Sequence, residues 1–368
     1  MKKLGFGLMR LPLLDSNDQT SIDIEQTKQM VDSFLEQGFT YFDTAWMYHA
    51  FSSETAIREA LVKRHPRESY TLADKLHAAY IKTKDDRDKV FNEQLKKTGV
   101  SYFDYYLLHD VRESHYKIYN DLDCINWLRE KKKAGLVKHM GFSFHDNAAF
   151  LEKVLTEVPD FEFVQLQINY LDWDSDSVQS RKCYEVARAH GLDIIVMEPV
   201  KGGTLANVPA SVETMFKKAS PELSIPSWAI RFAAGLEGVM VVLSGMSNLS
   251  QLKDNTGYMR DFKPLSDSER ELVFRAADII RNNVAIPCTG CSYCTDGCPM
   301  NISIPKVFAL YNNMSKNPSE NIVGEYDTLT KQGGSASSCI ACGQCESVCP
   351  QELEIIELLK KVSQKFER

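Results

Sequence analysis

Two short runs of cysteines near the C-terminus constrain this chain more than any other part of its sequence. The first run, CTGCSYCTDGCP, covers residues 288–299, and the second run, CIACGQCESVCP, covers residues 339–350. Both have two residues between the first three cysteines, three residues before the fourth, and a proline directly after it. Eight of the ten cysteines in the 368-residue chain lie in these runs. The fold must therefore bring two matching sets of thiols to defined positions.

This spacing is that of the bacterial ferredoxin run, in which the fourth cysteine of each run ligates the cluster of the other run. We therefore predict two 4Fe–4S clusters. The expected ligands of one are Cys288, Cys291, Cys294 and Cys349, and those of its partner are Cys298, Cys339, Cys342 and Cys345. Zinc is the alternative, but paired C-x2-C motifs of zinc ribbons would leave two of every four cysteines unexplained.

The chain between and after the two runs predicts the kind of module that holds the clusters. Residues 301–314 and 353–366 have the pattern of helices, whereas residues 317–338 are polar and predict a loop-rich segment. A long connection flanked by helices resembles an α-helical ferredoxin module more than a compact β-type ferredoxin. We place this domain at residues 288–368, after a helix and linker at residues 266–287.

The bulk composition excludes several other classes of function. A formal charge of −7 without a compensating basic stripe argues against a nucleic-acid partner. No apolar run approaches the roughly 20 residues that span a bilayer. We expect a cytoplasmic protein, where structural disulfides are rare. The two cysteines outside the runs, Cys124 and Cys183, are interpreted as buried small hydrophobic residues.

Residues 1–265 alternate between short β-branched or aromatic runs and amphipathic stretches of helix length. The eight candidate strands cover residues 4–9, 41–45, 70–75, 103–109, 138–143, 163–168, 193–198 and 239–244. Five of the intervening helices are expected to end on a glycine, at Gly38, Gly99, Gly135, Gly191 and Gly235. Eight such units in about 260 residues predict a TIM barrel of the α/β class. A doubly wound sheet is the competitor, but the G-x-G-x-x-G turn typical of it is absent.

Polar residues stand at the C-terminal ends of the predicted strands, where a TIM barrel carries its chemistry. They are Asp43, Lys75, His109, Ser143, Gln167, Glu198 and Ser244, and Tyr48 lies in the loop after the second strand. One such residue alone would be interpreted as structural. Polar side chains at so many strand ends of one face indicate an active site.

The blocks around these residues resemble the aldo-keto reductase family. They are FDTAWMYHAFSSETAIREAL at 42–61, LADKL at 72–76, DYYLLHD at 104–110, GFSF at 141–144 and SGMSNLSQLKDN at 244–255. The resemblance extends from residue 4 to about residue 260, and it places the family's catalytic tetrad on Asp43, Tyr48, Lys75 and His109. It implies an oxidoreductase that acts on a small-molecule carbonyl or alcohol.

Residue chemistry supports these roles. A phenol with a pKa near 10 is a reluctant proton donor at neutral pH. A nearby ammonium is expected to lower that pKa, and an aspartate keeps the ammonium charged. Tyr48 is thus the expected general acid, Lys75 the group that tunes it, and Asp43 the anchor of Lys75. His109 is expected to orient the substrate oxygen.

The resemblance also implies nicotinamide contacts from Ser143 and Gln167, with Met197, Ser244 and Asn255 at further cofactor-binding positions. Several positions depart from the family. Phe144 replaces the asparagine after the strand-end serine, and Met197 replaces the tyrosine that stacks on nicotinamide. The places of the lysine and arginine that hold the NADP 2′-phosphate are taken by Gly245 and Gln251. We therefore expect weakened NADP binding or a different reductant.

Three functions remain open from the sequence. The leading one is an iron–sulfur aldo-keto reductase in which two clusters conduct electrons. In the second, the barrel has lost NADPH-dependent reduction and serves flavin- or ferredoxin-linked electron transfer. KGG at 201–203 would then offer a phosphate site for FMN, although a plain tight turn is the favoured interpretation of this segment. The third is a redox sensor. NAD(P)H, FMN, and a ferredoxin or flavoprotein partner all stay open as electron sources.

Overall fold

A computed structural model describes residues 2–316 and 319–367. The chain divides into two compact units. The first consists of residues 1–174, 179–199 and 226–267, and the second of residues 175–178, 200–225 and 268–368. The bounds of these units differ from those predicted from the sequence. Residues 175–178 and 200–225 fall within the range predicted for the barrel, but they belong to the second unit.

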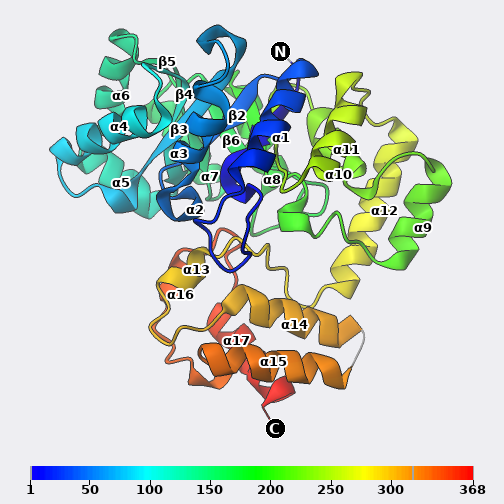
Figure 1. The fold of residues 1–368 in the computed structure, drawn as a ribbon. Helices are drawn as coiled ribbons and strands as arrows, with labels where there is room; N and C mark the ends of the chain where they lie inside the picture. The colour runs from blue at the N-terminus through cyan, green and yellow to red at the C-terminus, as the bar shows by residue number, and fades with distance from the viewer. Residues whose placement is uncertain (1, 317–318, 368) are drawn as a thin grey trace. The chain divides into compact units, whose positions relative to one another are not determined.

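The first unit is a closed barrel of eight parallel strands, each paired with its neighbours in chain order (Figure 1). The strands are β1 Leu4–Gly7, β2 Tyr41–Asp43, β3 Thr71–His77, β4 Phe103–Val111, β5 Val137–Phe144, β6 Phe163–Gln167, β7 Asp193–Met197 and β8 Val239–Gly245. The predicted TIM barrel is thereby confirmed, and every predicted strand overlaps an observed one.

One layer of side chains in the barrel is apolar. It comprises Tyr41, Ala73, Leu107, Phe163, Ile195, Val241 and Leu243. Glycine stands next to this layer in two strands, β1 and β5. A side chain on Gly141 would overlap the backbone of Phe163, and one on Gly5 would lie 2.6 Å from Val241. Interior packing at this density is a general property of protein cores.

Helices follow the strands and pack on the barrel. They are α1 Ile24–Glu36, α2 Tyr48–Phe51, α3 Ser53–Ile57, α4 Lys84–Thr98, α5 Glu113–Asp121, α6 Cys124–Lys133, α7 Ala148–Glu157, α8 Ser180–Ala189, α10 Ile225–Ala234 and α11 Leu249–Arg260. Asp23 caps α1 by accepting from the amide of Gln26. Of the five expected stop glycines four have positive φ, but Gly235 does not. Gly238 takes the left-handed conformation instead, at φ +73°.

The second unit is mainly helical. Its helices are α9 Ala210–Ala219, α12 Asp267–Asn283, α13 Tyr293–Asp296, α14 Ile304–Lys316, α15 Glu320–Gln332, α16 Gln344–Ser347 and α17 Ile355–Phe366. Its core includes Val307 and Phe308 of α14 and Leu359 of α17. Tyr326 stacks on Phe366 with ring centroids 4.6 Å apart. The predicted helices at 301–314 and 353–366 correspond to α14 and α17.

Helix α15 corrects the prediction of a loop-rich segment at 317–338, of which residues 317 and 318 lie outside the described residues. Ser319 caps the helix by accepting from the amide of Asn321. Ile322, Tyr326 and Leu329 recur at helical spacing and pack against the core of this unit. The polar residues between them form the outer face of the helix. The high polar content of the segment therefore obscured the helical spacing of its apolar residues.

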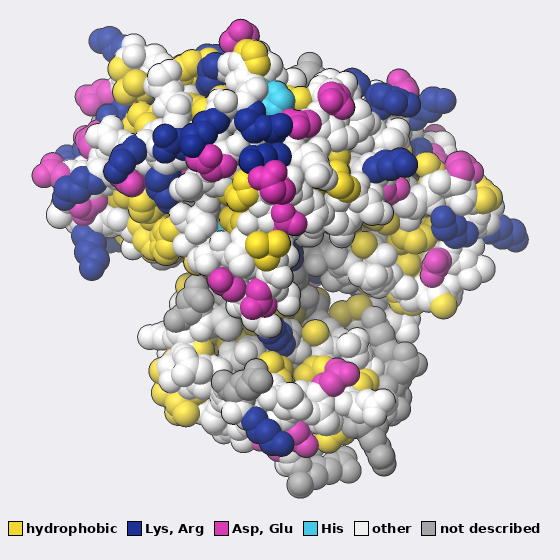
Figure 2. Space-filling model, viewed as in Figure 1, with side chains coloured by type: hydrophobic (Ala, Val, Ile, Leu, Met, Phe, Trp, Pro, Cys, Tyr) yellow, Lys and Arg dark blue, Asp and Glu magenta, His cyan; other side chains and the backbone are white. Residues whose placement is uncertain are grey.

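The surface carries both signs of charge. On the face of the barrel unit seen in Figure 2, aspartate and glutamate side chains are scattered among those of lysine and arginine. Within the described part of the chain, no helix combines the length and apolar character that crossing a membrane requires.

Candidate active site and cluster-binding site

The four tetrad residues come together at the C-terminal end of the barrel strands. Asp43 ends β2, Lys75 and His109 lie in β3 and β4, and Tyr48 begins α2. The ammonium of Lys75 donates to Asp43 Oδ1 at 2.5 Å and to the carbonyl of Thr44 at 2.6 Å. The structure thus forms the predicted pair between Lys75 and its aspartate anchor.

Burial dominates the electrostatics of this pair. Lys75 has 0% and Asp43 2% of its surface exposed. Burial raises the pKa of Asp43, while the charge of Lys75 and hydrogen bonds from Lys75 and Gln165 oppose that rise. Removal of either partner would leave the other as an uncompensated buried charge. The pair is therefore fixed in position.

Tyr48 lies beside this pair without a hydrogen bond to the ammonium. The Lys75 nitrogen is 5.0 Å from the centroid of the Tyr48 ring, and the His109 ring is edge-on to Tyr48 at 6.1 Å. Burial raises the pKa of Tyr48 well above its usual value, and the charges of Asp43, Asp74 and Glu198 add to the rise. The expected lowering by Lys75 is thus outweighed, and Tyr48 is protonated at neutral pH.

His109 is neutral for a related reason. Burial lowers its pKa well below the usual value, and the charges of His77 and Lys75 lower it further. Its Nδ1 atom is buried without a hydrogen-bond partner in the described structure. A neutral imidazole beside a protonated phenol is an arrangement in which one group donates a proton and the other orients an oxygen.

The residues expected near a nicotinamide lie at the same strand ends. Ser143 Oγ accepts from the amide of Asp110 at 2.8 Å, which leaves its own hydrogen free to donate. Gln167 donates to Asp172 at 3.0 Å. Ser244 accepts from Asn255 at 2.8 Å. Met197 ends β7 and is partly buried.

Arg10 is a candidate that the sequence analysis missed. It follows β1, and its side-chain carbons lie 3.2–3.3 Å from where a side chain on Gly245 would begin. Ser247 Oγ also donates to the Arg10 carbonyl at 2.8 Å. The absence of a side chain at Gly245 therefore leaves room for the side chain of Arg10, a cation from another loop.

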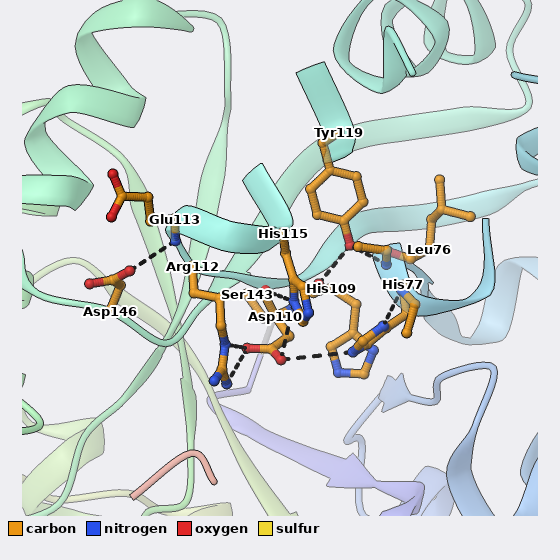
Figure 3. A network of polar contacts seen from close by, with 12 residues as sticks. Leu76, His77, His109, Asp110, Arg112, Glu113, His115, Tyr119, Ser143 and Asp146 are labelled. Atoms are coloured by element: carbon orange, nitrogen blue, oxygen red, sulfur yellow. Dashed lines mark hydrogen bonds and ion pairs between the residues drawn. The ribbon is translucent and has the colours of Figure 1, made fainter. Parts of the chain in front are cut away.

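Histidines surround Asp110 next to the tetrad (Figure 3). His77, Asp110 and His115 offer atoms within 4.8 Å of one another, the spacing of a metal site. However, the amide of Ala79 donates to His77 Nδ1, so the proton of a neutral His77 lies on Nε2, which faces Asp110 Oδ2 at 3.8 Å. His115 Nδ1 lies 2.8 Å from the Asp110 carbonyl and must donate to it. Both nitrogens nearest the carboxylate carry protons, and the cluster is a hydrogen-bond network.

This network fixes the backbone around His109. Asp110 has φ +56° and follows His109 at an irregularity in the pairing of β4 with β5. The hydroxyl of Tyr119 lies 2.7 Å from the His109 carbonyl and 2.9 Å from the Leu76 carbonyl. It also accepts from the amide of Ala78 at 2.9 Å. One tyrosine of α5 thus holds the ends of β3 and β4 together.

Two buried carboxyl groups lie on the other side of β3. Asp74 and Glu54 are both 0% exposed, and each has one oxygen without a hydrogen-bond donor in the described structure. Burial raises the pKa of both, that of Asp74 strongly, and the neighbouring charge of Glu54 adds to the rise at Asp74. Gln94 donates to Asp74 and Lys97 forms an ion pair with Glu54. The two carboxyl groups are best described as sharing one proton.

The eight cysteines of the second unit line two cavities. The first cavity is lined by Cys288, Cys291, Cys294 and Cys349 together with Thr289 and Gln351. The second cavity is lined by Cys298, Cys339, Cys342 and Cys345. The empty space in each cavity, together with the solvent at its mouth, is about 320 Å³. The structure brings the thiols together in the two crossed sets that the spacing predicted.

The donors at both cavities fit 4Fe–4S clusters. Each cavity presents four cysteines, and none of its other lining residues is histidine, aspartate or glutamate. The remaining lining is mostly apolar, including Ile304, which lines both, and Phe308 of the first cavity. Four thiolates in apolar surroundings are the ligand set that iron–sulfur clusters use. By contrast, Cys124 and Cys183 lie in buried helix positions of the barrel unit.

A barrel with this tetrad and a unit with two four-cysteine cavities define an iron–sulfur oxidoreductase. Comparison with protein families agrees: residues 3–276 match the aldo/keto reductase family, and residues 287–354 match the 4Fe-4S dicluster domain. The chain belongs to the aldo/keto reductase family. It has no significant match among curated proteins.

Solved structures similar to this chain are aldo-keto reductases. An aldo-keto reductase from Bacillus halodurans in its holo form matches with a TM-score of 0.61 at 21% identity, over 74% of this chain and 91% of that one. The NADPH complex of an aldo-keto reductase from Klebsiella pneumoniae matches with a TM-score of 0.57 at 15% identity, over 74% and 90%. A putative 2,5-diketo-D-gluconic acid reductase B matches with a TM-score of 0.57 at 23% identity, over 74% and 87%. At these identities the likeness shows the fold.

Proposed function

We propose that this oxidoreductase interconverts a small-molecule carbonyl and the corresponding alcohol, with Tyr48 as proton donor and two 4Fe–4S clusters as electron conduit. The observation that carries the proposal is the presence, in one chain, of two four-cysteine cavities and a barrel site in which Lys75 is bonded to Asp43 beside Tyr48. Neither half alone would link single electrons to a carbonyl.

In the barrel site each side chain has a task set by its surroundings. Reduction of a carbonyl to an alcohol adds two electrons and two protons. One proton goes to oxygen, and the other goes to carbon, either within a hydride or from solvent when the electrons arrive singly. Tyr48, held protonated by burial, gives the proton to oxygen, and neutral His109 orients that oxygen. Lys75 then stabilises the phenolate left on Tyr48, and Asp43 keeps Lys75 charged and in place.

The cluster cysteines would be Cys288, Cys291, Cys294 and Cys349 at the first cavity and Cys298, Cys339, Cys342 and Cys345 at the second. When bound, each cluster would carry one electron at a time. Two clusters in one chain therefore match the two electrons of a carbonyl/alcohol pair. The protein contributes the thiolates and the apolar lining around them.

NADPH is one candidate reductant, because a relative with the same barrel binds it. In this chain Ser143, Gln167, Met197, Ser244 and Asn255 would hold the nucleotide. Arg10 would supply the cation that Gly245 and Gln251 lack. When bound, NADPH would supply a hydride to carbon.

The KGG segment gives no support to FMN. A phosphate site with one cation and backbone amides was the alternative there to a plain tight turn. The Lys201 ammonium donates to Gln351, and Gly202 lies against the backbone of Thr289. Nothing in the comparisons points to a flavin.

A second candidate is electron transfer without NADPH-dependent carbonyl reduction, and the departures at Met197, Gly245 and Gln251 favour it. An anaerobic assay with a panel of aldehydes and ketones separates the two. Reduction with NADPH supports the first, whereas reduction only with dithionite-reduced ferredoxin supports the second. In either case the loss of activity in Tyr48→Phe would identify the barrel site as the place of carbonyl chemistry. Full activity of this variant would refute its role.

A further inference from the structure

A buried lysine lies beside one of the two cysteine cavities. Lys201 belongs to segment 200–225, which is part of the second unit, and only 3% of its surface is exposed. Its ammonium donates to Gln351 Oε1 at 2.7 Å. Gln351 follows Cys349 and Pro350 in the chain and lines the first cavity. One side chain therefore separates the ammonium from the expected cluster.

The backbone around Lys201 is tightly held. Gly202 has φ +62°, and a side chain there would overlap the carbonyl of Thr289, the residue after Cys288. Lys201 itself has φ +46°, a conformation that residues other than glycine seldom adopt. Segment 200–225 thus lies against Thr289, which follows Cys288, and against Gln351, two residues after Cys349, and both cysteines line the same cavity. The charge of Lys201 is fixed in place by these contacts.

Neither cavity has a charged residue in its lining, and Lys201 reaches the first one through Gln351. The lining of the second cavity consists of apolar residues, cysteines and a glycine. A lysine does interact with Cys339 of this cavity, namely Lys360. However, Lys360 is exposed and forms an ion pair with Glu357 at 2.6 Å. Solvent and an opposite charge screen it, so its field at the cluster is weak. The two cavities also differ in access, since Cys342 of the second is exposed.

We propose that Lys201 makes the cluster of the first cavity the one with the higher reduction potential, an inference that rests on the proposed function because it requires the clusters. Reduction adds a negative charge to a cluster, and a buried ammonium stabilises the more negative form. The potential of such clusters responds to net charge, hydrogen bonds and solvent exposure. At roughly 10 Å and an effective dielectric constant near 20, one unit charge changes a reduction equilibrium by somewhat more than tenfold.

The two clusters are therefore reduced in a fixed order. An electron that enters the protein settles on the first cluster, and the exposed second cluster exchanges electrons with external donors or acceptors. Both electrons are held together only when the donor is reducing enough to fill the second cluster as well.

The test is an anaerobic redox titration of the full-length protein, monitored by electron paramagnetic resonance, with Lys201→Met, Lys201→Arg and Lys360→Met. We expect two one-electron transitions in the unmodified protein. Lys201→Met should lower the higher one, with about a tenfold loss in its reduction equilibrium, or about 59 mV. Lys201→Arg, which keeps the charge, and Lys360→Met, the matched exposed control, should leave both transitions in place. In a Cys349→Ser background Lys201→Met should have no effect on the remaining transition.

The outcomes separate the two proposals. If the clusters are present but Lys201→Met moves neither transition, or moves the lower one, the role of Lys201 is refuted and the proposed function stands. An equal shift in Lys360→Met would also refute it. If the unmodified protein has no iron–sulfur signal, the proposed function fails and this inference fails with it.

Discussion

The ammonium of Lys75 lies 2.5 Å from Asp43 Oδ1, with 1% and 3% of the two side chains exposed. In most proteins lysine reaches water, so a lysine enclosed inside a barrel indicates a task other than solubility. The carboxylate offsets the cost of burying the ammonium, and the Thr44 carbonyl accepts a further hydrogen bond. The pair sets both the stability of the site and its chemistry.

We predict that Lys75→Met lowers the free energy of unfolding by about 3–5 kcal/mol at pH 8, because it leaves a buried, unpaired carboxylate. Burial raises the pKa of Asp43, and the loss of Lys75 removes the charge that opposes this rise. The folded variant therefore binds a proton more readily than the unfolded chain, so its stability falls as pH rises above about 4. Urea denaturation at pH 5 and pH 8 measures both effects.

The matched control is Lys63→Met, which removes an exposed lysine paired with Glu59. It should change the free energy of unfolding by about 0.5 kcal/mol or less at either pH. Equal stability losses in the two variants would contradict the view that the Lys75–Asp43 pair is special.

Tyr48→Phe removes only the proton donor. We expect kcat for carbonyl reduction to fall about 10²- to 10⁴-fold, while iron content and stability stay unchanged. Tyr105→Phe is a suitable control, because this tyrosine lies in β4 and donates to Met240 away from the tetrad. A rate within a few-fold of the unmodified protein in Tyr48→Phe would remove this residue from the mechanism.

The crossed ligation of the clusters has a spectroscopic signature. Cys349→Ser and Cys291→Ser should lose the same cluster, although the two residues lie in different runs, because both line the first cavity. Cys298→Ser and Cys342→Ser should lose the other one. Electron paramagnetic resonance of the four variants would then give two matching pairs of residual spectra. Pairing by run, with Cys349→Ser matching Cys342→Ser, would overturn the assignment.

The proton shared by Glu54 and Asp74 predicts a pH dependence of stability. Both carboxyl groups have raised pKa values in the folded chain, so the folded state binds a proton that the unfolded state releases above about pH 4. The free energy of unfolding therefore falls as pH rises from about 4 through the raised pKa values of the folded state. Glu54→Gln replaces one acid by an amide, and thermal unfolding between pH 5 and pH 9 should show a shallower decline than in the unmodified protein. A decline of the same steepness would refute the shared proton.

The position of the Arg10 side chain against Gly245 predicts that the protein prefers NADPH to NADH. If this side chain contacts the 2′-phosphate, Arg10→Ala should raise the Kd of NADPH by about 10- to 100-fold, the value of a hydrogen bond to a charged group, and leave that of NADH unchanged. Calorimetry with both nucleotides measures the ratio. An unchanged ratio would mean that this chain does not recognise the phosphate through Arg10.

The barrel could be predicted from sequence because its signals are local. Each strand is a short β-branched or aromatic run, and the polar residues at the strand ends, such as Asp43 and His109, stand out against apolar interiors. The cysteine sets could be predicted for the same reason, since spacing within each run limits what its thiols can reach.

What the sequence did not predict depends on contacts between distant residues. Nothing local places Lys201 against Gln351, 150 residues away, or Glu54 against Asp74. The pKa of Tyr48 was wrongly expected to fall, because the expectation counted the ammonium and not the burial that outweighs it. Helix α15 was missed because its apolar residues are few, although they share one face.

The most direct test is to measure the iron, acid-labile sulfide and zinc content of the protein purified without oxygen. Two 4Fe–4S clusters predict about eight iron and eight sulfide atoms per chain, and a brown protein that bleaches on reduction. Colourless protein that carries zinc in place of iron would contradict the account.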